Sequence, residues 1–372
     1  MRKCDTLLLR ACDLEVVTQA VGIHRLMLEC IDRIRQVIGG EGESGASLVE
    51  TPPRAGFSYT RENGELGLLE WMPARKSAER ATVKVVGYHP SNPDSCALPS
   101  ILSTISRYEL ETGRLVALAD ATFLTALRTG AASAAMTDVL ARSDAVVLGI
   151  VGCGAQAVTQ IHGISHVRDV RKILAYDTDS TAAESLQERL PFFSGVVTVL
   201  TLAELPLLMA ESNIICTCTS QQPGAGPVIP DAEIRPGLHI NAVGSDFPDK
   251  VELPLGLLRR GVVCPDFREQ AMAEGECQML EPGEIGPTMR DVLSAPASFA
   301  YLREALTVFD STGWALEDDI AMDVLIGHAL CLGAYIEVAL EHLPKDPKNP
   351  YSGLWMDRKQ SSDVSLENAV LK

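Results

Sequence analysis

The segment AVVLGIVGCGAQAVTQ occupies residues 145–160. A continuous apolar run leads into the pattern Gly152-x-Gly154-x-x-Ala157, and small, helix-forming residues follow it. Gly152 permits a tight turn, Gly154 lets the backbone approach a pyrophosphate, and Ala157 keeps the helix close to the strand. The segment therefore predicts the strand, phosphate-binding loop and helix of a Rossmann-type dinucleotide-binding domain.

An acidic residue ends the next strand-like run, KILAYD at 172–177. Asp177 follows the first glycine of the loop at close to the expected spacing of about 20 residues. A carboxylate there can accept hydrogen bonds from both ribose hydroxyls and would repel a 2′-phosphate. We therefore expect the cofactor to be NAD rather than NADP.

The order and spacing of strand-like and helix-like runs divide the chain into two parts. Strand-like and helix-like runs alternate from residue 145 to 313, which predicts a parallel sheet covered by helices on both faces. The earlier part has strand-like runs separated only by short gaps, which predicts an antiparallel sheet. These runs are 66–72, 81–89, 101–108 and 114–120.

We therefore expect an α/β protein of two domains. A Rossmann-type NAD domain at 133–317 follows a second α/β domain at 1–132, which has a mainly antiparallel sheet and is completed by 318–372. Other segments are expected as a helix over 14–38 stopped by Gly39-Gly40, an irregular stretch over 41–65, a helix over 121–141 and a long apolar helix over 317–341.

Composition excludes several classes of function. The 372 residues carry a formal net charge of −17, whereas binding to nucleic acid or an anionic membrane surface needs a positive footprint. The sequence shows no secretory signal and no apolar run long enough for a transmembrane helix. Its 10 cysteines are scattered, which is typical of free thiols in a reducing cytoplasm, and its histidines are dispersed, so we expect no metal site.

Charged residues in apolar surroundings are the candidates for a substrate site. Arg54, Lys84 and Arg128 either point to solvent or, if buried, together bind a substrate carboxylate. Glu70 is flanked by apolar residues, and Asp246 follows a strand of the Rossmann half, at the edge where such sheets bind ligands. Each of these two acids is either a surface residue or a group that anchors an amine and moves protons.

With these residues identified, the chain resembles the ornithine cyclodeaminase/mu-crystallin family from about residue 50 to 330. The resemblance rests on LLEWMP, VKVVGYHPSN, TALRTGAASA, VGCGAQA, INAVGSDFPDKVELP and VFDSTGWALEDDIA. Within the family, LEWMP, LPSILSTISRY, EGECQ and STGWALED look most like bacterial lysine cyclodeaminases.

The resemblance implies a role for each matching position. Arg54, Lys84, Arg128 and Thr312 would bind the substrate, and Asp246, Glu70 and Lys84 would be catalytic. The cofactor would be held by Ser100, Gly152, Gly154, Ala155, Gln156, Asp177, Thr217, Val243, Lys250 and Ser311.

The implied reaction starts when NAD⁺ takes a hydride from the substrate Cα. The side-chain amine then attacks the resulting imine, ammonia leaves, and the hydride returns to the cyclic imine. We expect L-lysine to give L-pipecolate. The alternatives are L-ornithine giving proline, a net amino-acid dehydrogenase or imine reductase, and a non-catalytic binding protein. The family also implies a homodimer that assembles through the N-terminal sheet domain, with a small amino acid as ligand, whereas the expected cytoplasmic location rests on the free thiols.

Overall fold

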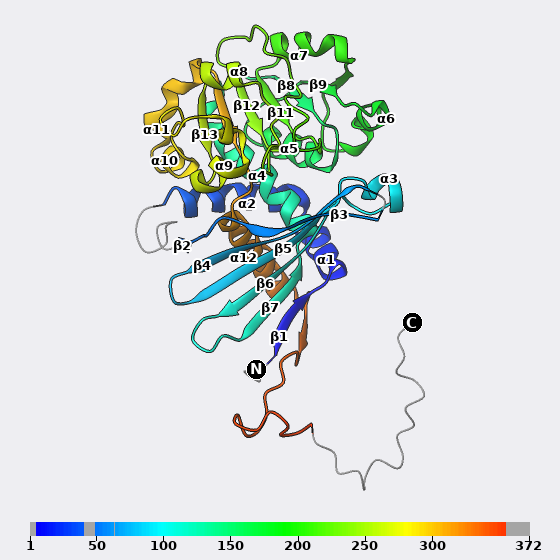
Figure 1. Ribbon diagram of the computed structural model, residues 1–372, viewed down its shortest axis with the longest axis vertical. Coiled ribbons are helices and arrows are strands. Elements are labelled where there is room, and N and C mark those ends of the chain that lie inside the picture. Colours follow the sequence, from blue (N-terminus) through cyan, green and yellow to red (C-terminus); the bar gives the residue numbers. More distant parts are fainter. Residues whose placement is uncertain (1–4, 41–48, 63, 355–372) are drawn as a thin grey trace.

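The computed structural model describes residues 5–40, 49–62 and 64–354, and it has two domains stacked end to end (Figure 1). The upper domain is built on a seven-stranded sheet in the order β10-β9-β8-β11-β12-β14-β13, and every neighbouring pair is parallel. Its strands are β8 (Val147–Val151), β9 (Lys172–Tyr176), β10 (Val196–Val199), β11 (Ile214–Thr217), β12 (His239–Ala242), β13 (Val262–Pro265) and β14 (Thr307–Asp310). The predicted Rossmann-type sheet is confirmed.

Short helices connect these strands and cover both faces of the sheet (Figure 1). They are α5 (Ala155–Ser165), α6 (Ser180–Glu184), α7 (Leu205–Glu211), α8 (Leu255–Arg260), α9 (Arg268–Glu274), α10 (Met289–Ser294) and α11 (Pro296–Phe299). Single 3₁₀ turns occur at Gln187–Arg189, Leu202–Glu204, Glu276–Met279 and Ala300–Glu304.

The lower domain has an eight-stranded sheet in the order β15-β1-β7-β6-β5-β4-β2, with β3 also paired to β4. The strands are β1 (Thr6–Leu9), β2 (Val49–Glu50), β3 (Ala55–Thr60), β4 (Leu66–Lys76), β5 (Arg80–Tyr88), β6 (Ile101–Glu109), β7 (Leu115–Asp120) and β15 (Ile336–Val338). Every pairing is antiparallel except β1 with β7. The prediction of a mainly antiparallel second sheet is therefore confirmed.

Helices join and line the two sheets. They are α1 (Ala11–Val21), α2 (Ile23–Ile38), α3 (Asn92–Cys96), α4 (Thr122–Leu140) and α12 (Ala315–Leu332). The Ala-rich α4 runs from the lower sheet to the upper one and is buried along nearly its whole length, while α12 leads the chain back. The domain boundaries predicted at 132/133 and 317/318 fall inside these two helices.

Three local predictions were wrong. The helix expected over 14–38 is interrupted at Gly22, whose φ of +86° suits glycine and ends α1 before α2 begins. The stretch expected to be irregular contains β2 and β3; 41–48 and 63 lie outside the described residues. All six residues of β3 are exposed; the strand pairs with β4, and Phe57 packs edge-on against Trp71.

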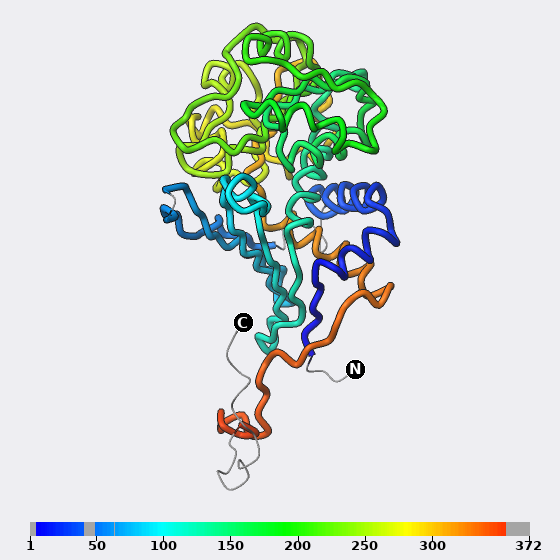
Figure 2. Tube along the Cα trace, turned by 90° about the vertical axis from the view of Figure 1, so that its right-hand side faces the viewer, coloured from blue at the N-terminus to red at the C-terminus, as the bar shows by residue number. Residues whose placement is uncertain are grey.

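The third error concerns the helix expected over 317–341, which ends at Leu332. Gly333 caps it in the left-handed conformation, with φ +66°. The chain then forms β15 and pairs with β1, which brings it alongside the N-terminal strand (Figure 2). The apolar residues beyond Leu332 thus belong to a sheet edge instead of a helix.

Candidate active site

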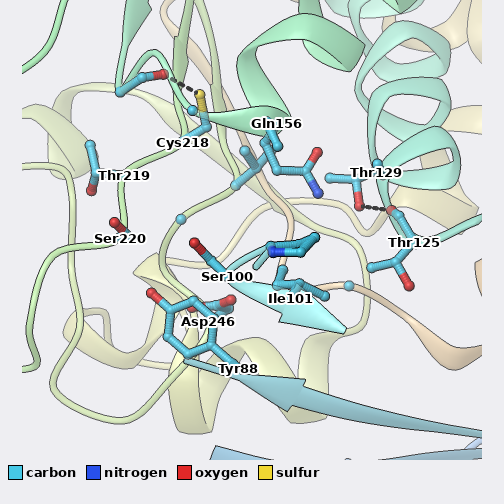
Figure 3. A pocket seen from close by; sticks show the side chains of 18 of the residues that line it. Tyr88, Ser100, Ile101, Thr125, Thr129, Gln156, Cys218, Thr219, Ser220 and Asp246 are labelled. Atoms are coloured by element: carbon cyan, nitrogen blue, oxygen red, sulfur yellow. Dashed lines mark hydrogen bonds between the residues drawn. The ribbon is translucent and has the colours of Figure 1, made fainter. Parts of the chain in front are cut away.

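A cavity of about 1590 Å³ lies between the two domains, and residues of both sheets line it. Ligand pockets are usually about 300–1,000 Å³, so this one has room for a dinucleotide together with a small substrate. Apart from Thr217, which is fully buried in β11, every site residue predicted from the sequence lines it. In Figure 3, Gln156 lies on one side of this pocket, and Ser100, Asp246 and Tyr88 lie on the other.

The predicted phosphate-binding loop joins β8 to α5 at the edge of this cavity. Gly152 has φ +91°, and a Cβ there would lie 2.7 Å from the carbonyl oxygen of Cys218, so only glycine fits the turn. A Cβ on Gly154 would meet no atom within 4 Å. The space in front of the N-terminus of α5 is thus open, as close approach of a pyrophosphate requires.

Asp177 follows β9 and lies beside this loop. Its Oδ2 accepts a hydrogen bond of 2.6 Å from the backbone N–H of Cys153, and its Oδ1 accepts one of 2.9 Å from that of Asp179. Arg189 donates a bond of 2.7 Å to the carbonyl oxygen of Cys153 and also lines the cavity. The sequence did not single out Arg189, which helps to hold the loop in place.

The far end of the cofactor region is formed where β12 and β14 end. The backbone N–H of Ser311 donates to the carbonyl oxygen of Ala242, and Val243 lies beside this contact on the cavity wall. The Ser311 hydroxyl is buried and has no hydrogen-bond partner among the described residues. Because buried polar groups are normally hydrogen-bonded, this hydroxyl is available to bond an amide group of a ligand in the cavity. The residues present therefore fit a dinucleotide.

Lys84 and Arg128, two of the three predicted carboxylate-binding cations, converge on α12. Asp318 Oδ1 lies 2.8 Å from Lys84 Nζ and 2.9 Å from Arg128 Nε, and Glu317 Oε2 lies 3.0 Å from Arg128 Nη1. All four side chains are buried. Burial lowers the pKa of Lys84 to about 8 and raises that of Glu317 to about 8, so both groups titrate near neutrality.

Arg54 belongs to a second, more acidic cluster. Its Nε lies 2.6 Å from Glu274 Oε1, its Nη1 lies 3.5 Å from Glu70 Oε2, and its Nη2 donates to the carbonyl oxygen of Thr312. Burial raises the pKa of Glu274 to about 8 despite Arg54, and the nearby Glu70 and Asp246 carboxylates add to the shift. Burial also raises the pKa of Glu70. A carboxyl group with a pKa like that of Glu274 can exchange protons near neutral pH.

Asp246 lies on the loop after β12 and pairs with Lys250, which we predicted to contact the cofactor. Lys250 Nζ donates a bond of 2.8 Å to Asp246 Oδ1 and lies 3.5 Å from the Tyr88 hydroxyl. Burial disfavours the Lys250 ammonium, but Asp246, together with Tyr88 and Glu252, outweighs this effect and raises the pKa of Lys250. The structure therefore joins a predicted cofactor residue to a predicted catalytic one.

The loop that carries Thr312 is fixed by two residues that the sequence did not single out. Thr312 Oγ1 donates a bond of 3.0 Å to Asp266 Oδ1 and accepts one of 2.8 Å from Gln270 Nε2. Asp266 also accepts from the backbone N–H of Gly313. The sequence also did not single out Glu317 and Asp318, although it carries a sign of them. The run EDD at 317–319 lies near the start of an otherwise apolar helix, and carboxylates that are buried there need partners.

Comparison with known proteins agrees with this geometry. The model of the ornithine cyclodeaminase/mu-crystallin family matches residues 14–330. L-lysine cyclodeaminase from Streptomyces rapamycinicus is 41% identical over 339 residues, which are 91% of this chain and 96% of that protein. No helix among the described residues is long and apolar enough to cross a membrane.

Two solved structures share the fold. A lysine cyclodeaminase studied for its recognition of L-lysine, L-ornithine and L-2,4-diaminobutyric acid matches with a TM-score of 0.89 and 43% identity, over 94% of this chain and 99% of that one. An archaeal alanine dehydrogenase dimer with bound NAD matches with a TM-score of 0.77 and 27% identity, over 91% of this chain and 100% of that one.

Proposed function

The chain belongs to the ornithine cyclodeaminase/mu-crystallin family, and on that premise we propose that it is an NAD-dependent lysine cyclodeaminase that converts L-lysine to L-pipecolate and ammonia. The observation that carries the proposal is the single cavity that contains both the glycine-rich loop and the buried cations. Likeness to a lysine cyclodeaminase over nearly the full length of both chains supports the substrate class.

The cofactor would lie along the upper wall of the cavity. Its pyrophosphate would face Gly152, Gly154, Ala155 and Gln156, its adenine ribose would bind Asp177, and its nicotinamide end would lie near Val243 and Ser311, with Ser100 and Thr217 completing the site. When bound, NAD⁺ supplies an acceptor for the substrate's hydride and later returns it, so the reaction has no net redox change.

The basic residues would orient the substrate. Lys84 and Arg128 present a fixed pair of donors to the α-carboxylate, and Arg54 approaches from the opposite cluster beside Thr312. Because the Asp318 carboxylate already pairs with both cations, they are held in position before the substrate arrives. Such preorganisation directs Cα toward the cofactor without further ordering of the protein.

The acidic residues would handle protons. Ring closure needs a deprotonated side-chain amine, and Asp246, which Lys250 holds in position by a hydrogen bond, can bind that amine and accept its proton. Glu70 and Glu274 face the same region from the Arg54 cluster, and their raised pKa values suit proton transfer to departing ammonia.

Labelled lysine provides the test. Protein supplied with α-¹⁵N-lysine and catalytic amounts of NAD⁺ should release ¹⁵N-ammonia and form unlabelled pipecolate, because the side-chain nitrogen becomes the ring nitrogen. NADH should not accumulate. Label retained in the cyclic product, or NADH formed in proportion to product, would instead support the net amino-acid dehydrogenase or imine reductase, for which the alanine dehydrogenase fold provides a precedent.

We also propose that the protein is a cytoplasmic homodimer that pairs through the lower sheet. Phe57, Leu69 and Leu102 lie in one row across β3, β4 and β6 and expose 62%, 41% and 41% of their surface. An exposed apolar row of this kind is typical of an interaction surface. Sedimentation equilibrium should give twice the chain mass, and Phe57→Glu with Leu69→Glu should give monomers.

A further inference from the structure

Three histidines from distant parts of the chain meet at the junction of the two domains. His24 lies in the first turn of α2, His162 in the last turn of α5, and His166 caps the end of α5. His162 Nε2 lies 2.9 Å from His24 Nδ1 and 3.2 Å from His166 Nε2, and the three candidate ligand atoms all lie within 4.8 Å of one another. None of the three residues lines the active-site cavity.

Hydrogen bonding alone does not account for this arrangement. Both short contacts end on the same atom, His162 Nε2, which in a neutral ring carries either one proton or one lone pair. It can therefore make one full hydrogen bond at a time, while the other contact keeps two electronegative nitrogens close together. A cation that accepts all three lone pairs would satisfy the nitrogens at once.

The spacing of the nitrogens suits such a cation. Zn–N bonds are about 2.0–2.1 Å, which places neighbouring tetrahedral ligands about 3.3 Å apart. Two of the three separations, 2.9 and 3.2 Å, are close to this value and the third is within 4.8 Å, so small side-chain rotations would let all three nitrogens reach one ion. His24 is exposed, which leaves access for the ion and for a water as a fourth ligand.

We propose that His24, His162 and His166 form a binding site for a divalent transition metal that prefers imidazole ligands, with Zn²⁺ as the representative ion. Although the sequence predicts no metal site, it does contain one sign of this cluster. His162 and His166 are four residues apart on one helix, so their side chains lie on the same face. His24 joins them only through the fold.

The position of the site gives the metal a structural role. It links α2, which belongs to the lower domain, to α5, whose other end carries the glycine-rich loop. An ion held by both helices would fix the lower domain against the helix that faces the cofactor. Because the unfolded chain does not bring the three rings together, binding would stabilise the folded protein.

The test measures metal binding directly on full-length protein. After treatment with EDTA and removal of the chelator, titration with Zn²⁺ by calorimetry and elemental analysis should give one ion per chain. His24→Ala and His166→Ala should each weaken binding at least tenfold, because loss of a group that merely orients a metal ligand already costs about 10- to 100-fold, and the double variant should lose the site. His342→Ala, which removes an exposed histidine elsewhere, is the matched control and should bind as the native protein does.

A readout without variants is the melting temperature of the native protein, which Zn²⁺ should raise and EDTA should return to its starting value. Substoichiometric binding, or an affinity unchanged in the double variant, would overturn the proposal. Binding that needs His166 but not His24 would also overturn it, because the ion would then not join the two domains. None of these results depends on lysine turnover, so the proposed enzymatic activity is tested separately.

Discussion

The ammonium group of Lys84 lies 2.8 Å from Asp318 Oδ1, and both side chains are only 1% exposed. Removing one partner of a buried ion pair leaves an uncompensated charge, which costs about 3–5 kcal/mol. Asp318→Asn should therefore lower the free energy of unfolding by about 3 kcal/mol in urea titrations. It should also weaken substrate binding, because Arg128 loses the same partner.

Asp169→Asn is the matched control for this prediction. Asp169 pairs with Arg171, but the two side chains are 72% and 73% exposed, and such surface pairs contribute less than about 1 kcal/mol. Equal destabilisation of the two variants would show that the Lys84–Asp318 pair does not compensate buried charge in the folded protein.

The raised pKa of Glu274 predicts a pH dependence of stability. Its pKa is about 8 in the folded protein and 4.5 in a model peptide, so between these values the folded state binds the extra proton. Stability from this group is thus complete below pH 4.5 and is lost as the pH rises toward 8. Glu274→Gln should remove up to about 1 kcal/mol per pH unit from the slope of unfolding free energy against pH.

Urea unfolding at intervals from pH 5 to 8 measures this slope. Glu188→Gln removes an exposed carboxylate and should leave the native slope intact. If the slopes of Glu274→Gln and the native protein coincide, Glu274 is ionised in the folded state and cannot serve as the proposed proton donor.

Features of the site that lie close together along the chain could be predicted from the sequence. The loop at 152–157 and Asp177 lie within one strand–helix–strand unit, so their spacing alone predicts that they meet. The alternation of strands and helices likewise predicts the parallel sheet. We did not predict β3, a short and fully exposed strand that, among the described residues, joins the sheet only through its pairing with β4.

Partners of the buried cations could not be predicted in the same way. The sequence identifies Lys84 and Arg128 as charged residues in apolar surroundings, which must have partners if buried. Their partners, Asp318 and Glu317, come from a helix almost 190 residues further along the chain than Arg128. Which residue becomes a long-range partner depends on how α4, α12 and β5 pack together. The hydrophobic periodicity and the motif spacing of the sequence do not predict that packing.

Asp177→Ala should weaken NAD binding about 10- to 100-fold, because a hydrogen bond to a charged group is worth about 1.5–3 kcal/mol. It should also reduce the preference for NAD over NADP, since the carboxylate that would repel a 2′-phosphate is gone. Fluorescence titration with both dinucleotides measures this. Asp179→Ala, which removes the N-cap of α6 in the same loop, should keep the preference; an unchanged preference in Asp177→Ala would refute the role of that carboxylate.

Asp246→Asn should lower kcat by about 10²- to 10⁴-fold while NAD stays bound, because an amide cannot take the proton of the attacking amine. Asp249→Asn is the control: it lies in the same loop, is exposed, and has φ +63°, a conformation that asparagine also tolerates. Near-normal kcat in Asp246→Asn would move the role of proton acceptor to Glu70 or Glu274.

The enzyme should prefer lysine to ornithine by a modest ratio of kcat/KM. The two substrates differ by one methylene, and a pocket distinguishes a methylene by about 1–3 kcal/mol, or about 10- to 200-fold in kcat/KM. Both amino acids present the same α-carboxylate to Lys84 and Arg128, so the difference arises at the distal amine, where the shorter ornithine chain reaches Asp246 less well. We therefore expect measurable proline formation from ornithine, with kcat/KM lower than for lysine by a factor within that range.

Competition between the two substrates, with both cyclic products measured by mass spectrometry, gives the ratio directly. A ratio that favours ornithine would leave the roles of Asp246 and the cations intact and would change only the assigned substrate, whereas failure of either diamine to cyclise would refute the proposed activity.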